Sequence, residues 1–74
     1  MNNDRRKILA EAQDLISQAK ELIEQVKDEE QESFDNLPES IQQSERGETM
    51  QENVSTLEQA MDTLEEVYDE VGCM

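Results

Sequence analysis

Rows of carboxylates are the residues of this chain with the clearest capacity for chemistry. The stretch TLEQAMDTLEEVYDEV, residues 56–71, holds six acids and no Lys or Arg. Acids four residues apart on a helix destabilise it by about 0.2 to 0.5 kcal/mol per pair. One interpretation is a solvated side that only keeps the protein soluble; the other is electrostatic binding of a basic partner. The candidate binding residues are Glu58, Asp62, Glu65, Glu66, Asp69 and Glu70.

No catalytic or metal site is predicted. The chain has no His, and its acids are too numerous and too exposed to single out a general acid and base. No D-x-[DN]-x-[DN]-G loop for calcium is present, and the Glu-x-x-His pairs of two-iron bundles cannot occur. Cys73 is the only cysteine and is predicted to be an ordinary thiol near the chain end. We expect a protein that is not an enzyme and has no cofactor.

The net charge of −14 is unevenly placed. Residues 1–27 hold five acids and five bases, whereas residues 28–74 hold fifteen acids and only Arg46. Such a surface repels nucleic acid and anionic membranes, which predicts no direct nucleic-acid binding and favours a basic protein partner. No membrane span or signal peptide is recognised, so we expect a cytoplasmic protein.

A first helix is predicted over about residues 4–32. Its apolar residues recur every seven positions in three rows: Ile8, Leu15 and Leu22; Leu9, Ile16 and Ile23; Ala12, Ala19 and Val26. Three rows make a stripe wide enough for two neighbouring helices. Lys20 is expected to pair with Glu24, and the acidic segment after Val26 is expected to fray at the end of the helix.

A joint with a short helical turn is predicted over about residues 33–47. Pro38 belongs in the first turn of a helix, because it has no N–H to donate. Phe34, Leu37 and Ile41 are expected to close one end of the fold, with an exposed contact patch as the alternative. At Gly47 either a helix has begun near Ser44 or another backbone approaches closely.

A second helix is predicted over about residues 48–71. Its apolar rows are Met50, Leu57, Leu64 and Val71; Val54, Met61 and Tyr68; Ala60 and Val67. The fold class is therefore all-α, an antiparallel helical hairpin in a single domain. Because so small a core supplies only about 3 to 5 kcal/mol, we expect a homodimer that forms a four-helix bundle. The predicted oligomer core is Leu15, Ile16, Leu22, Ile23, Val54, Leu57, Met61, Leu64 and Tyr68.

The second half of the chain resembles small acidic helical proteins of phages and prophages of Gram-positive bacteria. The resemblance is carried by Leu37-Pro38-Glu39-Ser40 followed by Ser44-Glu45-Arg46-Gly47-Glu48. It brings no established activity or site residue. It implies a setting in the cytoplasm of a bacterial host, where small phage proteins often bind and redirect a host enzyme or a defence complex.

Two hypotheses of function follow. In the first, the acidic second helix docks in a basic groove of a host or defence protein as an inhibitor, in its sharpest form a DNA mimic, and salt weakens the complex steeply. In the second, the chain is a structural or assembly module whose apolar stripes engage helices of a partner. Binding of that kind is insensitive to salt and depends on Leu57, Met61 and Leu64.

Overall fold

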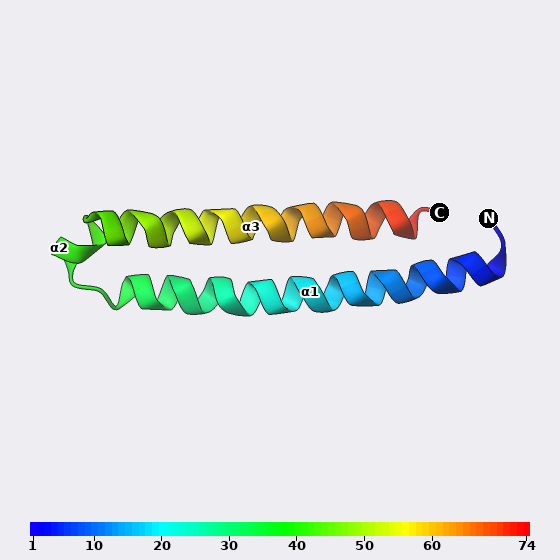
Figure 1. Cartoon of the computed structure of the whole chain (residues 1–74), viewed down its shortest axis with the longest axis horizontal. Helices are drawn as coiled ribbons and strands as arrows, with labels where there is room; N and C mark the ends of the chain where they lie inside the picture. Colours follow the sequence, from blue (N-terminus) through cyan, green and yellow to red (C-terminus); the bar gives the residue numbers. More distant parts are fainter.

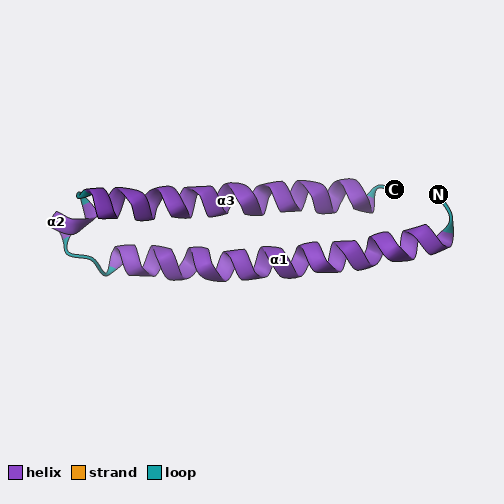
Figure 2. Cartoon of the chain, in the orientation of Figure 1, coloured by secondary structure: helices purple, strands orange, loops and turns teal.

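The computed structural model describes residues 1–74 and consists of helices joined by short turns (Figure 2). The helices are α1 (Asn3–Asp35), α2 (Glu39–Gln42) and α3 (Glu45–Gly72). The prediction of an all-α fold is confirmed. None of the three helices combines the length and apolar character that crossing a bilayer requires.

Helix α1 is longer than the sequence predicts, because its acidic end does not fray. Asn2 caps its start by accepting a hydrogen bond from the backbone N–H of Arg5 (2.8 Å). The helix continues past residue 32 to Asp35, whose carboxylate accepts a hydrogen bond from Gln31 (3.0 Å). It ends shortly before Pro38, which disfavours helical backbone at the residue that precedes it. Local hydrogen bonds thus keep the acidic segment helical.

The joint contains the single turn of α2, and α3 begins three residues earlier than expected, at Glu45. Ser44 is in an extended conformation, and its carbonyl oxygen accepts a hydrogen bond from the N–H of Glu48 (3.0 Å). The side chain of Gln42 donates to the carbonyl oxygen of Phe34 (3.0 Å) and ties α2 to the end of α1. Phe34, like Leu37 and Ile41, is half-buried at this end of the molecule.

Helices α1 and α3 lie side by side and run in opposite directions, with α2 at one end and both termini at the other (Figure 1). The first turns of α1 extend beyond the end of α3 (Figure 1). The resulting rod measures 58 × 15 × 11 Å, and its radius of gyration is 17.0 Å. A compact domain of this length has a radius of gyration of about 11 Å. The molecule is therefore too thin to enclose a core.

Only one apolar side chain, that of Val54, is buried. The other apolar residues between α1 and α3 are half-buried: Leu9, Ala12, Ile16, Ala19, Ile23, Met50, Leu57, Ala60, Met61, Leu64 and Val71. Two helices touch along one line, so each covers only part of the stripe on the other.

Gly47 lies where the first turn of α3 passes the backbone of α2. A Cβ atom at this position would lie 2.1 Å from the carbonyl oxygen of Gln42 and 2.7 Å from its Cα. Both alternatives raised at Gly47 therefore hold, since α3 begins at Glu45 and a second backbone also approaches. Glycine is required at position 47 because the backbone of Gln42 leaves no space for a side chain. A left-handed conformation is not the reason, since no glycine has a positive φ.

We expect Gly47→Ala to lower the free energy of unfolding by about 1 to 3 kcal/mol, because the α2 backbone must move to admit the methyl group. Urea denaturation followed by circular dichroism at one fixed protein concentration measures this change. Gly72→Ala is the matched control, since its Cβ meets only the flexible end of the Gln13 side chain. A loss at Gly72 as large as that at Gly47 would contradict the role of the close approach.

Two candidate binding faces

Three polar contacts join α1 to α3, one of them a hydrogen bond from Gln13 Nε2 to the carbonyl oxygen of Tyr68 (3.0 Å), and the other two show how the helices are rotated about each other. The Lys20 Nζ atom lies 3.3 Å from Glu65 Oε2, and Asn53 Nδ2 donates to Glu30 Oε2 over 3.0 Å. Successive residues rotate by about 100° around a helix. By that rotation the two contacts lie on opposite sides of the line where α1 and α3 meet. The flat pair of helices therefore has two distinct faces.

The face that carries Lys20 and Glu65 is acidic. Four of the six predicted binding residues lie on it: Glu58, Asp62, Glu65 and Asp69. Glu24 and Asp28 of α1 border the same face, which we call the acidic face. The other two predicted residues, Glu66 and Glu70, are exposed on the outer surface of α3, directed away from α1. The six acids thus do not form one surface.

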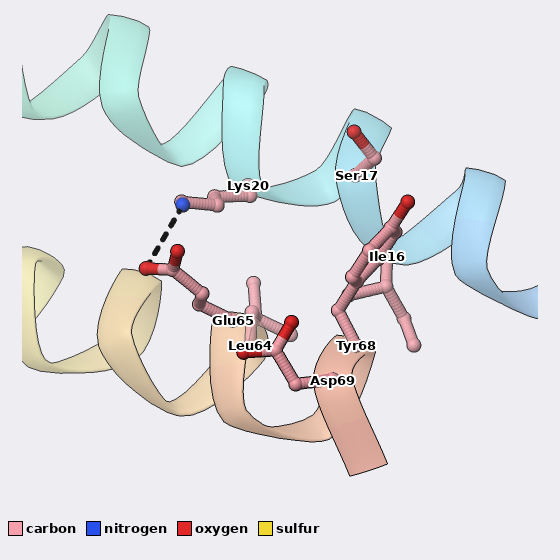
Figure 3. A pocket seen from close by; sticks show the side chains of 7 residues that line it. All are labelled: Ile16, Ser17, Lys20, Leu64, Glu65, Tyr68 and Asp69. Carbon is pink, nitrogen blue, oxygen red and sulfur yellow. Dashed lines mark ion pairs between the residues drawn. The ribbon is translucent and has the colours of Figure 1, made fainter. Parts of the chain in front are cut away.

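Glu65 is already paired, which the sequence did not indicate. The expected partner of Lys20 was Glu24 on its own helix, but Lys20 instead forms the only ion pair between α1 and α3, with Glu65. Figure 3 shows this pair beside a shallow hollow of about 180 Å³ that Ile16 and the ring of Tyr68 also line. Because both charges are substantially exposed, the ion pair fixes the relative position of the helices more than it stabilises them.

Lys27 is the second base on the acidic face. Its Nζ atom lies 3.1 Å from Asp28 Oδ1. This hydrogen bond, the charge of Asp28 and the nearby charges of Glu58 and Glu24 raise the pKa of Lys27 above its ordinary value, and partial desolvation opposes them. Carboxylates of both helices therefore act on one lysine. Two lysines against six acids leave this face strongly negative.

The opposite face is apolar along its centre and carries acids of α1 near its edges: Glu11 and Glu29 on the outer side of Leu22, and Glu30 at its contact with Asn53. Ile8, Leu15, Leu22 and Val26 of α1 lie on it with 52% to 65% of their surface exposed. Val67 of α3 lies beside them, also exposed, and α3 contributes no acid between its Thr56 and Val67 to this side. We call this surface the apolar face. Large side chains exposed in a continuous row typically mark a contact surface.

The predicted oligomer core is divided by the structure. Six of its residues lie between α1 and α3 within one chain: Ile16, Ile23, Val54, Leu57, Met61 and Leu64. Tyr68 is 39% exposed at the hollow, and only Leu15 and Leu22 lie on the apolar face. Ile8, Val26 and Val67, which the predicted oligomer core did not include, are also exposed on the apolar face. The seven-residue spacing of the apolar rows is visible in the sequence, but spacing alone does not show which row of α1 packs against α3 and which stays exposed.

No group of three or more His, Cys, Asp or Glu residues is arranged to hold a metal ion. No polar or charged side chain is buried, and Cys73 is a free, exposed thiol.

Comparison of the chain with protein-family models, with curated proteins and with solved structures gives no match. The two faces are therefore the candidate functional surfaces.

We expect Asp28→Asn to lower the pKa of Lys27 toward its ordinary value, because the nearest negative charge is removed and the amide oxygen that remains is a neutral acceptor. A raised pKa in the folded state means that the interaction contributes stability at neutral pH and that this contribution is lost as pH rises through the pKa. Nuclear magnetic resonance of the lysine side chains during an alkaline titration measures the shift. Asp14→Asn, on the outer side of α1, is the control, and an equal shift in that variant would contradict the assignment.

Proposed function

We propose that this protein is a non-enzymatic binding module whose acidic face docks in a basic groove of a host or defence protein. In this proposal the chain is a helical hairpin, and two copies associate through their apolar faces into a four-helix bundle in the cytoplasm of a bacterial host. The observation that supports it most is the separation of the two surfaces. Association through one face leaves the other free for a partner.

The charge spacing supports a basic groove as the partner. Glu58, Asp62, Glu65 and Asp69 follow one another at about 5 to 6 Å along the axis of α3. Phosphates along one DNA strand are about 3.4 Å apart. A groove lined with Lys and Arg tolerates the wider spacing, because its side chains are long and flexible. DNA mimicry is the most specific form of the proposal and requires the partner to accept a lower charge density.

The alternative is an assembly module that engages the helices of another protein through the apolar face. Exposure of Ile8, Leu15 and Leu22 favours it, since these side chains suit any complementary helix. In that case the acids only solvate the outside. Binding then depends on apolar contacts, which salt screens little.

Neutralising the acidic face is expected to weaken partner binding about tenfold or more, with a steep salt dependence, because several charge pairs are lost together. The variant combines Glu58→Gln, Asp62→Asn and Asp69→Asn and leaves the Lys20–Glu65 pair intact. Partners captured from a bacterial lysate at low salt are identified by mass spectrometry and purified. Their dissociation constants are then measured by titration calorimetry at two salt concentrations.

The matched control removes the same number of charges from the outer surface of α3, by Glu52→Gln, Glu66→Gln and Glu70→Gln. This control is expected to bind within about threefold of the parent. If both variants bind equally well while a Leu15→Ser, Leu22→Ser variant does not, the acidic-face proposal is wrong and the assembly module replaces it.

Sedimentation equilibrium of the reduced protein is expected to show a dimer at low and high salt. Leu22→Glu should raise the dissociation constant of the dimer at least tenfold, because it places a charge in an apolar contact. Gln59→Glu adds the same charge on the outer surface of α3, between Glu52 and Glu66, and should leave the dimer unchanged. A monomeric parent protein would refute the dimer.

A further inference from the structure

We infer that the second copy seats head to tail on the apolar face, so that α1 of one copy lies antiparallel over α1 of the other. This inference rests on the dimer of the proposed function and adds its geometry. A two-fold axis perpendicular to the helices runs along the apolar face, level with Ser17 of α1 and Val67 of α3. The rival arrangement has its axis along the rod and places both joints at the same end.

The apolar row of α1 is complementary to itself about Ser17. In an antiparallel contact centred at that level, Ile8 faces Val26 of the second copy, while Leu22 and Leu15 face Ala12 and Ala19, which are half-buried at the edge of the contact between α1 and α3. Each leucine thus meets a small side chain, which lets the two helices approach closely. A two-fold contact needs one patch that complements itself, and this row provides it.

Helix α3 supports the same axis independently. Ser17 lines the hollow that Leu64 and Tyr68 also line, so the axis reaches α3 at about Val67, the large apolar residue that α3 exposes on this face. Two copies of Val67 then meet each other. The earlier turns of α3, which this arrangement leaves uncovered, present Thr49, Asn53 and Thr56 on the same side. Apolar residues occur where the second copy covers α3, and polar residues occur where it does not.

The distribution of charge along α1 favours the head-to-tail orientation, because one end of this helix is basic and the other is acidic. The start of α1, which extends beyond α3, contains Arg5, Arg6 and Lys7 with only one acid, and none of the three bases forms an ion pair within the chain. Head to tail, these three bases lie level with Glu29, Asp28 and Lys27 of the second copy, in a segment that holds four acids between residues 28 and 32. In the rival arrangement α1 lies over α3 of the second copy, and the two joints, whose flanking segments are both acidic, meet at the same end, which is unfavourable.

The contact is also large enough. It extends over about 40 Å of α1 and about 20 Å of α3, and with helices about 10 Å wide it covers roughly 600 Å² per copy. Standard stable interfaces bury about 600 to 1,000 Å² per partner. The exposed row on α1 and Val67 on α3 make the centre of this contact apolar, as such interfaces require.

Cross-linking between copies tests the orientation. Ile8→Cys and Val26→Cys are made as separate single variants, each with Cys73→Ser, and are mixed and treated with a short bifunctional maleimide. Head to tail, the thiol introduced at position 8 of one copy faces the thiol introduced at position 26 of the other. The mixture should therefore give at least tenfold more linked dimer than either variant alone. Two thiols at position 8 would be about 27 Å apart along the axis, which the short reagent does not span.

The outcomes separate the two proposals. Sedimentation of each variant in reductant first establishes that the dimer persists, and a monomeric parent protein would refute the dimer itself. Persistent dimers that link in the mixture and not alone support the head-to-tail arrangement. Dimers that link equally in the single variants, or that do not link in the mixture, overturn the arrangement while the dimer stands.

Discussion

The structure depends on a mismatch between the width of each apolar stripe and the number of neighbours that a single chain supplies. Each helix carries apolar residues on about a third of its circumference, and one antiparallel neighbour covers only part of that width. As a result Val54 is the only buried apolar side chain, and a second row on α1 stays exposed. The rod shape, the thin core and the apolar face all follow from this mismatch.

The joint fixes which part of each stripe is covered. Pro38 ends helical geometry after α1, the turn of α2 reverses the chain, and Gly47 lets α3 start against the backbone of α2. A larger residue at position 47 would force the two segments apart. Because α3 is a rigid helix of 28 residues, a small change at this end would displace its far end much more.

Charged side chains are distributed unevenly between the acidic face and the apolar face. With a net charge of −14, two copies of this chain repel at most approaches. The exposed row at the centre of the apolar face consists of uncharged side chains, so an approach through that row brings no like charges into direct contact. On the acidic face Lys20 and Lys27 lie beside carboxylates of both helices, which offsets part of the repulsion between them. Most exposed apolar side chains and most acids of α3 thereby lie on opposite sides of one flat molecule.

The sequence by itself determined the all-helical class, the joint at Pro38 and the concentration of acids on the second helix, because helical periodicity, turn chemistry and charge are local properties. It placed the helix ends only within three residues, since side-chain hydrogen bonds such as Gln31 to Asp35 extend a helix that composition alone would end. Only the tertiary structure decided that Ile16 packs within the chain while Leu15 does not, and that Lys20 pairs with Glu65. These outcomes depend on the rotation of α1 relative to α3, which the contact between the helices sets and no single helix contains.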